Sequence, residues 1–329
     1  MPRAVLGPPA PRVTMMQQLT IPTPYAVGEV HIYTAEVDGE LILFDTGPPT
    51  APALACLKKN VDLDRLRHVF ITHCHVDHYG LADYLCKQSS AEIYLPHKDA
   101  VKIKHHHKRL DGIEGLLLEL GFEARFVELF RQTVVSAGVF PSFPQRYQVV
   151  EETDALERLG LSFLSCPGHS QSDLVYLGGD WAITGDTLLR GIFQAPLLDL
   201  DLDTFSGRFD NYGAYCTSLR RMATLRGRRI LPGHRWDVDS LDAAILFYVG
   251  KLLERAERIK EYADQDDVSA IVRQLFGTAM DDPFHVYLKV SEIIFMRDFL
   301  NRPHRLREAL VHLELFDAVA EKFMTLTTQ

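Results

Sequence analysis

Four side chains that can bind a metal ion lie within one short segment of this chain. The segment reads Thr-His-Cys-His-Val-Asp-His-Tyr-Gly and directly follows the apolar run at residues 68–71. Imidazole and carboxylate groups are ligands for zinc, and also for iron or manganese. The segment therefore predicts a metal site at the carboxyl end of a buried strand, which is where open α/β sheets bind their ligands. The four candidate ligands are His73, His75, Asp77 and His78.

Further candidate ligands are expected downstream, because two metal ions need six or seven ligands and this turn supplies four. Three later segments share one pattern, in which a short β-prone run and a glycine precede one residue of ligand type. The pattern places His169 after residues 161–165, Asp186 after residues 181–184 and His234 after residues 229–231.

The order His-x-His-x-Asp-His, Gly-His-Ser, Gly-Asp-Thr and Pro-Gly-His resembles the metallo-β-lactamase superfamily of hydrolases. The resemblance covers about residues 16–236 and implies an α/β fold, a four-layer αββα sandwich. It implies two divalent metal ions, with zinc as the first expectation and iron or manganese as alternatives. It also implies that Asp45 supports the site without binding metal. The implied ligands are His73, His75 and His169 for one ion, Asp77, His78 and His234 for the other, and Asp186 for both.

This resemblance implies hydrolysis by a hydroxide that bridges the two metal ions and attacks an ester-like bond. Asp77 is the candidate catalytic residue, as a proton shuttle after the attack. The β-lactamases themselves mostly carry Cys at the position of Asp186, so the chain is more similar to the glyoxalase II-like group. A thioester or a lactone, including an acyl-CoA-like compound, is the expected substrate. The alternatives are a phosphodiesterase with the same metal site and a non-enzymatic, metal-bearing regulatory protein.

Length and composition are typical of a globular enzyme. The 329 residues, 47% hydrophobic and 24% charged, suffice for one large domain and an appendage. No window approaches the roughly 20 consecutive apolar residues of a membrane helix, and the first residues lack the apolar core of a signal peptide. We therefore expect a cytoplasmic protein without a membrane partner. Its five scattered cysteines do not form a disulfide framework, and Cys74, between two ligands, is expected to pack away from the metals.

The chain divides into four regions of different character. The N-terminal region is rich in proline and is expected to be disordered, and helices are predicted at residues 50–59 and 77–88 of the catalytic domain. The C-terminal region has helical periodicity and resembles a winged-helix-like appendage. The predicted regions are 1–15 (N-terminus), 16–236 (catalytic domain), 97–147 within it (helical lid insertion) and 237–329 (C-terminal helical region).

Two features of the catalytic domain are candidates for a substrate pocket. Phe122, Phe126 and Phe130 recur every four residues, as on one face of a helix, and they either pack in the core or line a pocket for an acyl or aromatic group. Arg190, four residues after Asp186, is either an anion anchor or a solvated surface residue. The tract at residues 105–107 is three histidines within a basic run, which we expect at the surface.

The charge of the C-terminal region argues against nucleic acid as a partner. Residues 241–329 contain 11 Lys and Arg against 15 Asp and Glu, and the whole chain carries a net charge of −9. Phosphate backbones bind to clustered cations, so we expect a small-molecule substrate and no nucleic acid. The C-terminal helices then pack on the catalytic domain or on a second copy, which leaves a homodimer open.

Overall fold

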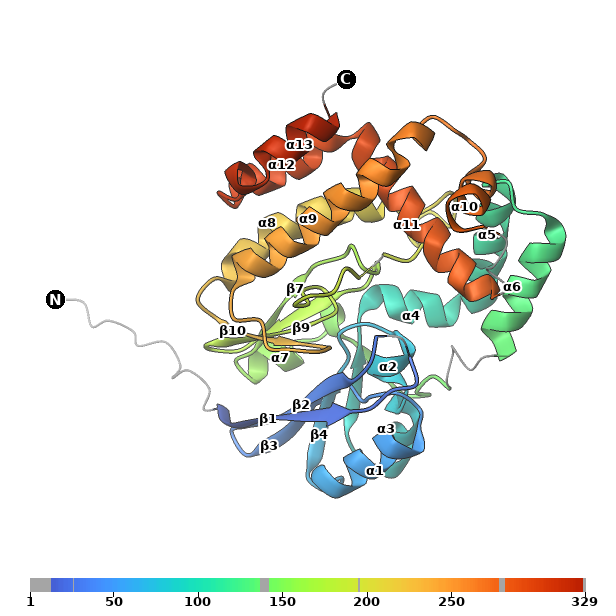
Figure 1. Cartoon of the computed structure of the whole chain (residues 1–329). Coiled ribbons are helices and arrows are strands. Elements are labelled where there is room, and N and C mark those ends of the chain that lie inside the picture. Colours follow the sequence, from blue (N-terminus) through green and yellow to red (C-terminus); the bar gives the residue numbers. More distant parts are fainter. Residues whose placement is uncertain (1–12, 26, 137–141, 195, 278–281, 328–329) are drawn as a thin grey trace.

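The computed structural model describes residues 13–25, 27–136, 142–194, 196–277 and 282–327 (Figure 1). Within these residues, the strands form a six-stranded sheet in the order β1-β2-β3-β4-β5-β6 and a four-stranded sheet in the order β10-β9-β8-β7. The strands are β1 (Val13–Ile21), β2 (Val30–Val37), β3 (Glu40–Phe44), β4 (Leu66–Phe70), β5 (Glu92–Leu95), β6 (Gln148–Val149), β7 (Ser162–Ser165), β8 (Leu174–Leu177), β9 (Trp181–Gly185) and β10 (Arg229–Pro232).

The first strand begins within the segment that was expected to be disordered. We expected disorder over residues 1–15, but β1 begins at Val13 and pairs antiparallel with β2. Residues 1–12 lie outside the described residues. The backbone of residues 13–15 thus belongs to the sheet, because its hydrogen-bonding groups are paired along the neighbouring strand.

The direction of the strands brings several loops to one edge of the molecule. Strands β2 and β3 form a hairpin, in which Asp38 and Gly39 take φ values of 50° and 88°, as Asp-Gly turns do. Strands β3 to β6 run parallel, and so do β9 and β10. The loops that follow β3 and β4 therefore leave the first sheet at the same edge, and those that follow β9 and β10 leave the second sheet together.

Side chains that alternate along the strands build four layers. In β3, Leu43 packs against α1 (Ala51–Asn60) and α3 (Ala82–Gln88), whereas Ile42 and Phe44 face the space between the sheets. In β9, Ala182 packs toward α8 (Asn211–Met222) and α9 (Leu241–Ile259), and Trp181 and Ile183 face the first sheet. Figure 1 shows the two sheets between these helix pairs. The predicted αββα sandwich with a C-terminal helical region is confirmed.

One predicted helix is divided in two. Residues 77–88 were expected to form a single helix, but α2 (Val76–Tyr79) ends before Gly80 and α3 begins at Ala82. A Cβ atom at Gly80 would lie 2.4 Å from the Val76 carbonyl oxygen and 2.5 Å from Cδ of Pro49. The backbone at residue 80 therefore lies so close to Pro49 that only glycine fits. Helical periodicity does not show this contact with the preceding loop.

The segment between β5 and β6 is helical and lies beside the C-terminal helices. Its helices α5 and α6 pack on each other, and α6 also packs on α11. Residues 137–141 of the predicted lid lie outside the described residues. The helices of this segment are α4 (His97–Lys104), α5 (His106–Glu119) and α6 (Ala124–Ser136), and α7 (Ala155–Arg158) follows β6.

The described residues of the C-terminal region do not include the strands of a winged helix. After Val238, which forms an isolated bridge with Ile230, the described residues up to 327 contain helices and turns but no strand. Across the described residues, no helix is both long enough and apolar enough to span a membrane. The helices after α9 are α10 (Val268–Phe276), α11 (Pro283–Asn301), α12 (Pro303–His312) and α13 (Ala320–Thr327).

Candidate metal centre

The loops at the strand ends bring all seven candidate ligands together between the two sheets. The backbone connects the sheets here, because the N–H of Leu174 donates to the carbonyl of Thr72 at 3.0 Å and that of His31 donates to Gly233 at 2.7 Å. The ligand atoms form two groups, each within a span of 4.8 Å. The first group contains His73, His75, His169 and Asp186, and the second contains Asp77, His78 and His234.

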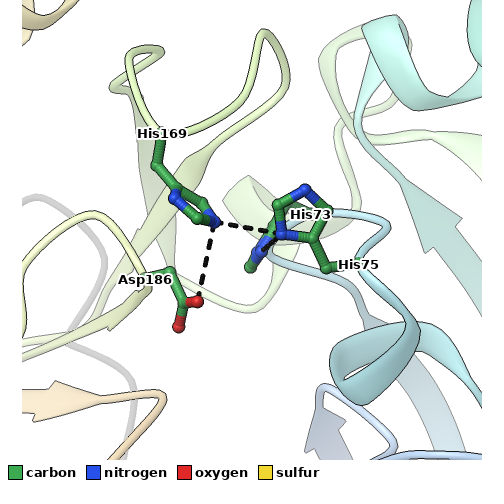
Figure 2. Close-up of side chains that lie close together, drawn as sticks. All are labelled: His73, His75, His169 and Asp186. Carbon is green, nitrogen blue, oxygen red and sulfur yellow. Dashed lines mark hydrogen bonds and ion pairs between the residues drawn. The ribbon is translucent and has the colours of Figure 1, made fainter. Parts of the chain in front are cut away.

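The first group consists of three imidazoles and one carboxylate (Figure 2). Nε2 of His73 and Nε2 of His169 each lie 3.0 Å from Nδ1 of His75. Oδ2 of Asp186 lies 3.6 Å from Nε2 of His169. Three ring nitrogens that converge in this way can direct their lone pairs at a single cation, which is the usual donor set of a histidine-rich metal site.

The second group shares Asp186 with the first. Nε2 of His234 lies 3.4 Å from Oδ2 of Asp77, and Nε2 of His78 lies 4.0 Å from Oδ1 of Asp77. Oδ1 of Asp186 is 3.3 Å from Nε2 of His78 and 3.3 Å from Nε2 of His234. Asp186 thus presents one carboxylate oxygen to each group, which is the geometry a bridging ligand needs.

Several buried atoms of the site lack hydrogen-bond partners. Nε2 of His78, Nε2 of His234 and Oδ1 of Asp186 are buried, yet none makes a hydrogen bond within the described part of the chain. Buried polar atoms are normally paired, and an unpaired one is costly. A divalent cation bound among these atoms would satisfy all three, so the residues fit a metal site.

Asp45 orients His78 of the second group through a hydrogen bond to its ring. Its Oδ2 accepts a hydrogen bond from Nδ1 of His78 at 2.8 Å, and its Oδ1 accepts one from the backbone N–H of Thr72 at 2.7 Å. Nδ1 of His234 donates in a similar way to the carbonyl of Glu29 at 2.6 Å. Because Nδ1 of each ring is engaged, Nε2 is left to face the other ligands, an arrangement that metal-binding histidines commonly show.

Two glycines let the strand ends approach the ligands. Gly185 has a φ of 48°, and a Cβ atom there would lie 2.7 Å from Oγ1 of Thr72. A Cβ atom at Gly233 would lie 2.8 Å from Oδ1 of Asp186 and 2.8 Å from Cε1 of His78. The glycine before each of these ligands is therefore required by space, and Gly185 also by its backbone conformation.

Burial and neighbouring charges give the ligands different proton affinities. Burial lowers the pKa of His73 well below its ordinary value, and His78 and His75 lower it further. Burial also lowers the pKa of His75, with help from His169. At His78 burial acts in the same direction, but the carboxylates of Asp186 and Asp45 outweigh it and raise the pKa well above its ordinary value. The imidazoles of His73 and His75 are thus neutral and able to bind a cation, whereas His78 must release a proton.

A cavity of about 460 Å³ opens beside the site, and His75 and Asp77 form part of its wall. Of the three predicted pocket phenylalanines, the structure places only Phe130 in this wall. Phe122, which precedes α6, and Phe126 lie with ring centroids 4.7 Å apart in the core. Phe122 and Phe126 therefore pack in the core, whereas Phe130 lines the pocket. Phe122 differs from Phe130 because it lies before the first turn of the helix.

Arg190 lies elsewhere on the molecule. Its Nη1 pairs with the carboxylate of Asp239 and donates to the carbonyl of Asp237 at 3.1 Å. The side chain lines a surface depression with Trp236, not the cavity of the metal centre. The predicted anion anchor at Arg190 is thus not part of this site, because its loop turns away after Asp186.

Sequence reasoning missed several residues of the cavity wall. His106, from the tract expected at the surface, lines the cavity together with Lys102 and Arg109. The spacing of these residues fits one helical face, a signal that could have placed them together. Leu288 of α11 also lines the cavity, and nothing local in the sequence connects it with the metal-binding segment.

Cys74 belongs to neither metal group but also lines the cavity. Its backbone N–H donates to Oδ2 of Asp99 at 2.8 Å, and burial raises the pKa of its thiol, with Asp99 adding to the effect. The thiol is therefore protonated at neutral pH, and it is not in the thiolate form that a nucleophilic cysteine requires.

Comparisons of the sequence with known proteins identify a family and related proteins. A sequence model of the metallo-beta-lactamase superfamily matches residues 25–234. The chain is 28% identical over 291 residues to the probable metallo-hydrolase YqjP of Bacillus subtilis, covering 83% of this chain and 88% of the relative. It is 22% identical over 275 residues to the Beta-lactamase-like protein 2 homolog of Caenorhabditis elegans, covering 81% of this chain and 76% of the relative.

Solved structures show the same fold. A metallo-beta-lactamase family protein from Thermus thermophilus has a TM-score of 0.68 at 22% identity, covering 88% of this chain and 94% of that one. A beta-lactamase domain protein from Burkholderia ambifaria has a TM-score of 0.69 at 19% identity, covering 91% of both chains. The matched segment, residues 25–234, contains all seven candidate ligands and Asp45. The chain belongs to the metallo-β-lactamase superfamily.

Proposed function

We propose that this protein is a hydrolase that binds two divalent metal ions and cleaves an ester-like bond, in a thioester or a lactone. The observation that carries the proposal is the position of Asp186. Its two carboxylate oxygens face two separate groups, at 3.6 Å from His169 on one side and at 3.3 Å from His78 and His234 on the other. A shared carboxylate of this kind suits a pair of ions with a water between them.

Each residue then has a defined task. The first group, with His73, His75 and His169, would hold one ion, and the second, with Asp77, His78 and His234, would hold the other. Two such ions, zinc by first expectation, would supply hydroxide at neutral pH and would polarise the carbonyl of the substrate. The chain itself orients the rings, through Asp45 at His78 and the Glu29 carbonyl at His234.

Asp77 is placed to move a proton between the site and the substrate, because it belongs to the second group and also lines the cavity. Burial alone would raise the pKa of Asp77, but the nearby His78 and His234 outweigh it and lower the pKa. The carboxylate is therefore ionised at neutral pH. It can accept a proton released in the attack and deliver it to the departing thiol or alcohol.

An ester-like substrate is favoured over a phosphodiester because the cations that line the cavity are already paired with carboxylates. Lys102 is bound to Asp99 at 2.9 Å, and Arg109 is bound to Asp199 at 2.7 Å. Phosphate groups are recognised by cations that are available to them. A neutral carbonyl compound does not need an available cation, so it suits this cavity better.

A reconstitution experiment tests the proposal. Protein purified with chelator is loaded with zinc, manganese or iron, its metal content is measured, and each form is assayed on thioesters, lactones and phosphodiesters. We expect close to two equivalents of metal per chain and turnover of a thioester or a lactone. Fewer than one equivalent after loading, or turnover of phosphodiesters alone, would overturn the proposal.

A further inference from the structure

The cavity beside the metal centre extends away from the two sheets. Its wall includes His75 and Asp77 of the metal-binding turn, and also residues of α5, α6 and α11. Figure 1 shows α4 between the strands and the pair α5 and α6, with α11 next to α6. A ligand that contacts both His75 and α11 must therefore reach across this insertion, so the cavity suits an elongated group.

Helices α5, α6 and α11 contribute several apolar side chains to the wall. Ile113 of α5, Phe130 and Val134 of α6 and Leu288 of α11 all line it. Phe130 also lies against Tyr287 of α11, with ring centroids 4.9 Å apart. Apolar surface of this kind gains free energy when it is covered by hydrocarbon and excludes water.

Lys102 and Arg109 in the wall are each paired with a carboxylate that also lines the cavity. The side chains of Lys102 and Asp99 are 12% and 0% exposed, and those of Arg109 and Asp199 are 11% and 8% exposed. Separating such a pair leaves an uncompensated buried charge, which is strongly destabilising. A substrate anion would therefore have to compete with Asp99 for Lys102 and with Asp199 for Arg109.

We propose that the substrate carries an uncharged, apolar acyl chain, which occupies this cavity against Phe130, Val134 and Leu288 while its ester-like carbonyl lies at His75 and Asp77. The inference rests on the proposed function, since that function places the reacting carbonyl at the metal centre. Through Leu288, the C-terminal helix α11 takes part in selecting the substrate.

A chain-length series tests the preference for acyl groups. The metal-loaded protein is assayed with thioesters of one thiol that carry acetyl, butanoyl, hexanoyl, octanoyl and decanoyl groups. We expect kcat/KM to rise by up to about fourfold per added methylene until the cavity is filled, from the burial of each methylene. Acyl groups of equal length that end in a carboxylate should react at least tenfold more slowly, and equal rates would overturn the inference.

Two matched variants locate the acyl chain. Leu288→Trp narrows the cavity and should lower the ratio of octanoyl to acetyl turnover at least tenfold. Val311 of α12 is 56% exposed and does not line the cavity, so Val311→Trp should leave that ratio unchanged. If Leu288→Trp does not fold, Phe130→Leu enlarges the same space and should shift the optimum to longer chains. An unchanged ratio in the folded cavity variant would overturn the assignment.

Binding without turnover separates this inference from the proposed function. Thioether analogues, in which a methylene replaces the carbonyl, carry alkyl chains of the same lengths and cannot be hydrolysed. Calorimetric titration should show Kd falling with chain length, and Leu288→Trp should abolish the trend. Hydrolysis without this trend would overturn the inference and leave the proposed function standing. The trend without hydrolysis of any thioester or lactone would overturn the proposed function and leave the apolar chain site standing.

Discussion

Asp186 lies between the two candidate metal groups, and its charge offsets the imidazoles on both sides. Asp186→Asn keeps the shape of the side chain but removes that charge, so we expect metal content to fall below two equivalents and turnover to fall roughly 100-fold or more. Elemental analysis and a thioester assay measure the two effects. Asp239, which pairs with Arg190 at the surface, offers the matched control Asp239→Asn. Near wild-type turnover in Asp186→Asn would contradict the assignment.

Asp45 is expected to act through its neighbours. In Asp45→Asn, an amide takes the place of a carboxylate that accepts hydrogen bonds from His78 and from the backbone and hydroxyl of Thr72. Losing such support from a ligating histidine typically costs about 10- to 100-fold in metal affinity. Competition with a chromogenic chelator measures this loss. A lower melting temperature with unchanged metal affinity would instead assign Asp45 a purely structural role.

Among individual residues, the sequence best predicts the placement of those whose position follows from local geometry. His169, Asp186 and His234 each come directly after a glycine near a strand end, so the strand itself determines where the side chain points. Arg190 lies four residues beyond Asp186, and its partner Asp239 is 49 residues away in the chain. Only the folded structure brings these two together, and no local pattern contains that information.

The helices of the insertion allow a test of how Phe122 and Phe130 differ. Both are nearly inaccessible, at 9% and 3% exposed, but only Phe130 lines the cavity. Phe122→Ala should cost about 3–5 kcal/mol of unfolding free energy and leave chain-length preference unchanged. Phe130→Ala should lower stability as well and also shift the preference. Urea unfolding beside the thioester series measures both, and an equal shift of preference in the two variants would contradict this division.

Elements with clear boundary signals are predicted best. The helix predicted at residues 50–59 corresponds to α1, which spans Ala51–Asn60 with Thr50 as its N-cap. The break at Gly80 arises from a contact with Pro49 that lies 31 residues away, and the turn at His105, between α4 and α5, precedes His106, which lines the cavity. Such breaks depend on tertiary contacts, which periodicity along one segment cannot reveal.

At the scale of the whole molecule, the C-terminal helices are continuous with the catalytic domain. Buried residues of α6, α8, α9 and α11 belong to one hydrophobic cluster that also covers the second sheet. The sequence correctly indicates helices here, but helical periodicity shows only that a face is apolar. It does not identify the surface that this face covers, and the winged-helix resemblance rests on that periodicity alone.

A shared core predicts that the molecule unfolds as one cooperative unit. Asp298 of α11 accepts two hydrogen bonds from Arg208, at 2.6 and 2.7 Å, in the loop before α8. Asp298→Ala should therefore cost about 1–3 kcal/mol, since Arg208 remains partly solvated once its partner is lost. Because α11 and the sheets share buried contacts, this loss should shift the transition of the entire chain.

Two probes on different parts of the molecule check that expectation. Trp181 is 4% exposed between the sheets and Trp236 is 61% exposed, so the change of tryptophan fluorescence in urea mainly follows the sandwich. Far-UV circular dichroism mainly follows the helices. For a single cooperative unit the two transitions coincide, and Asp298→Ala moves both midpoints equally. If circular dichroism shifts while fluorescence stays in place, the C-terminal helices unfold on their own, and α11 is then not a fixed wall of the catalytic cavity.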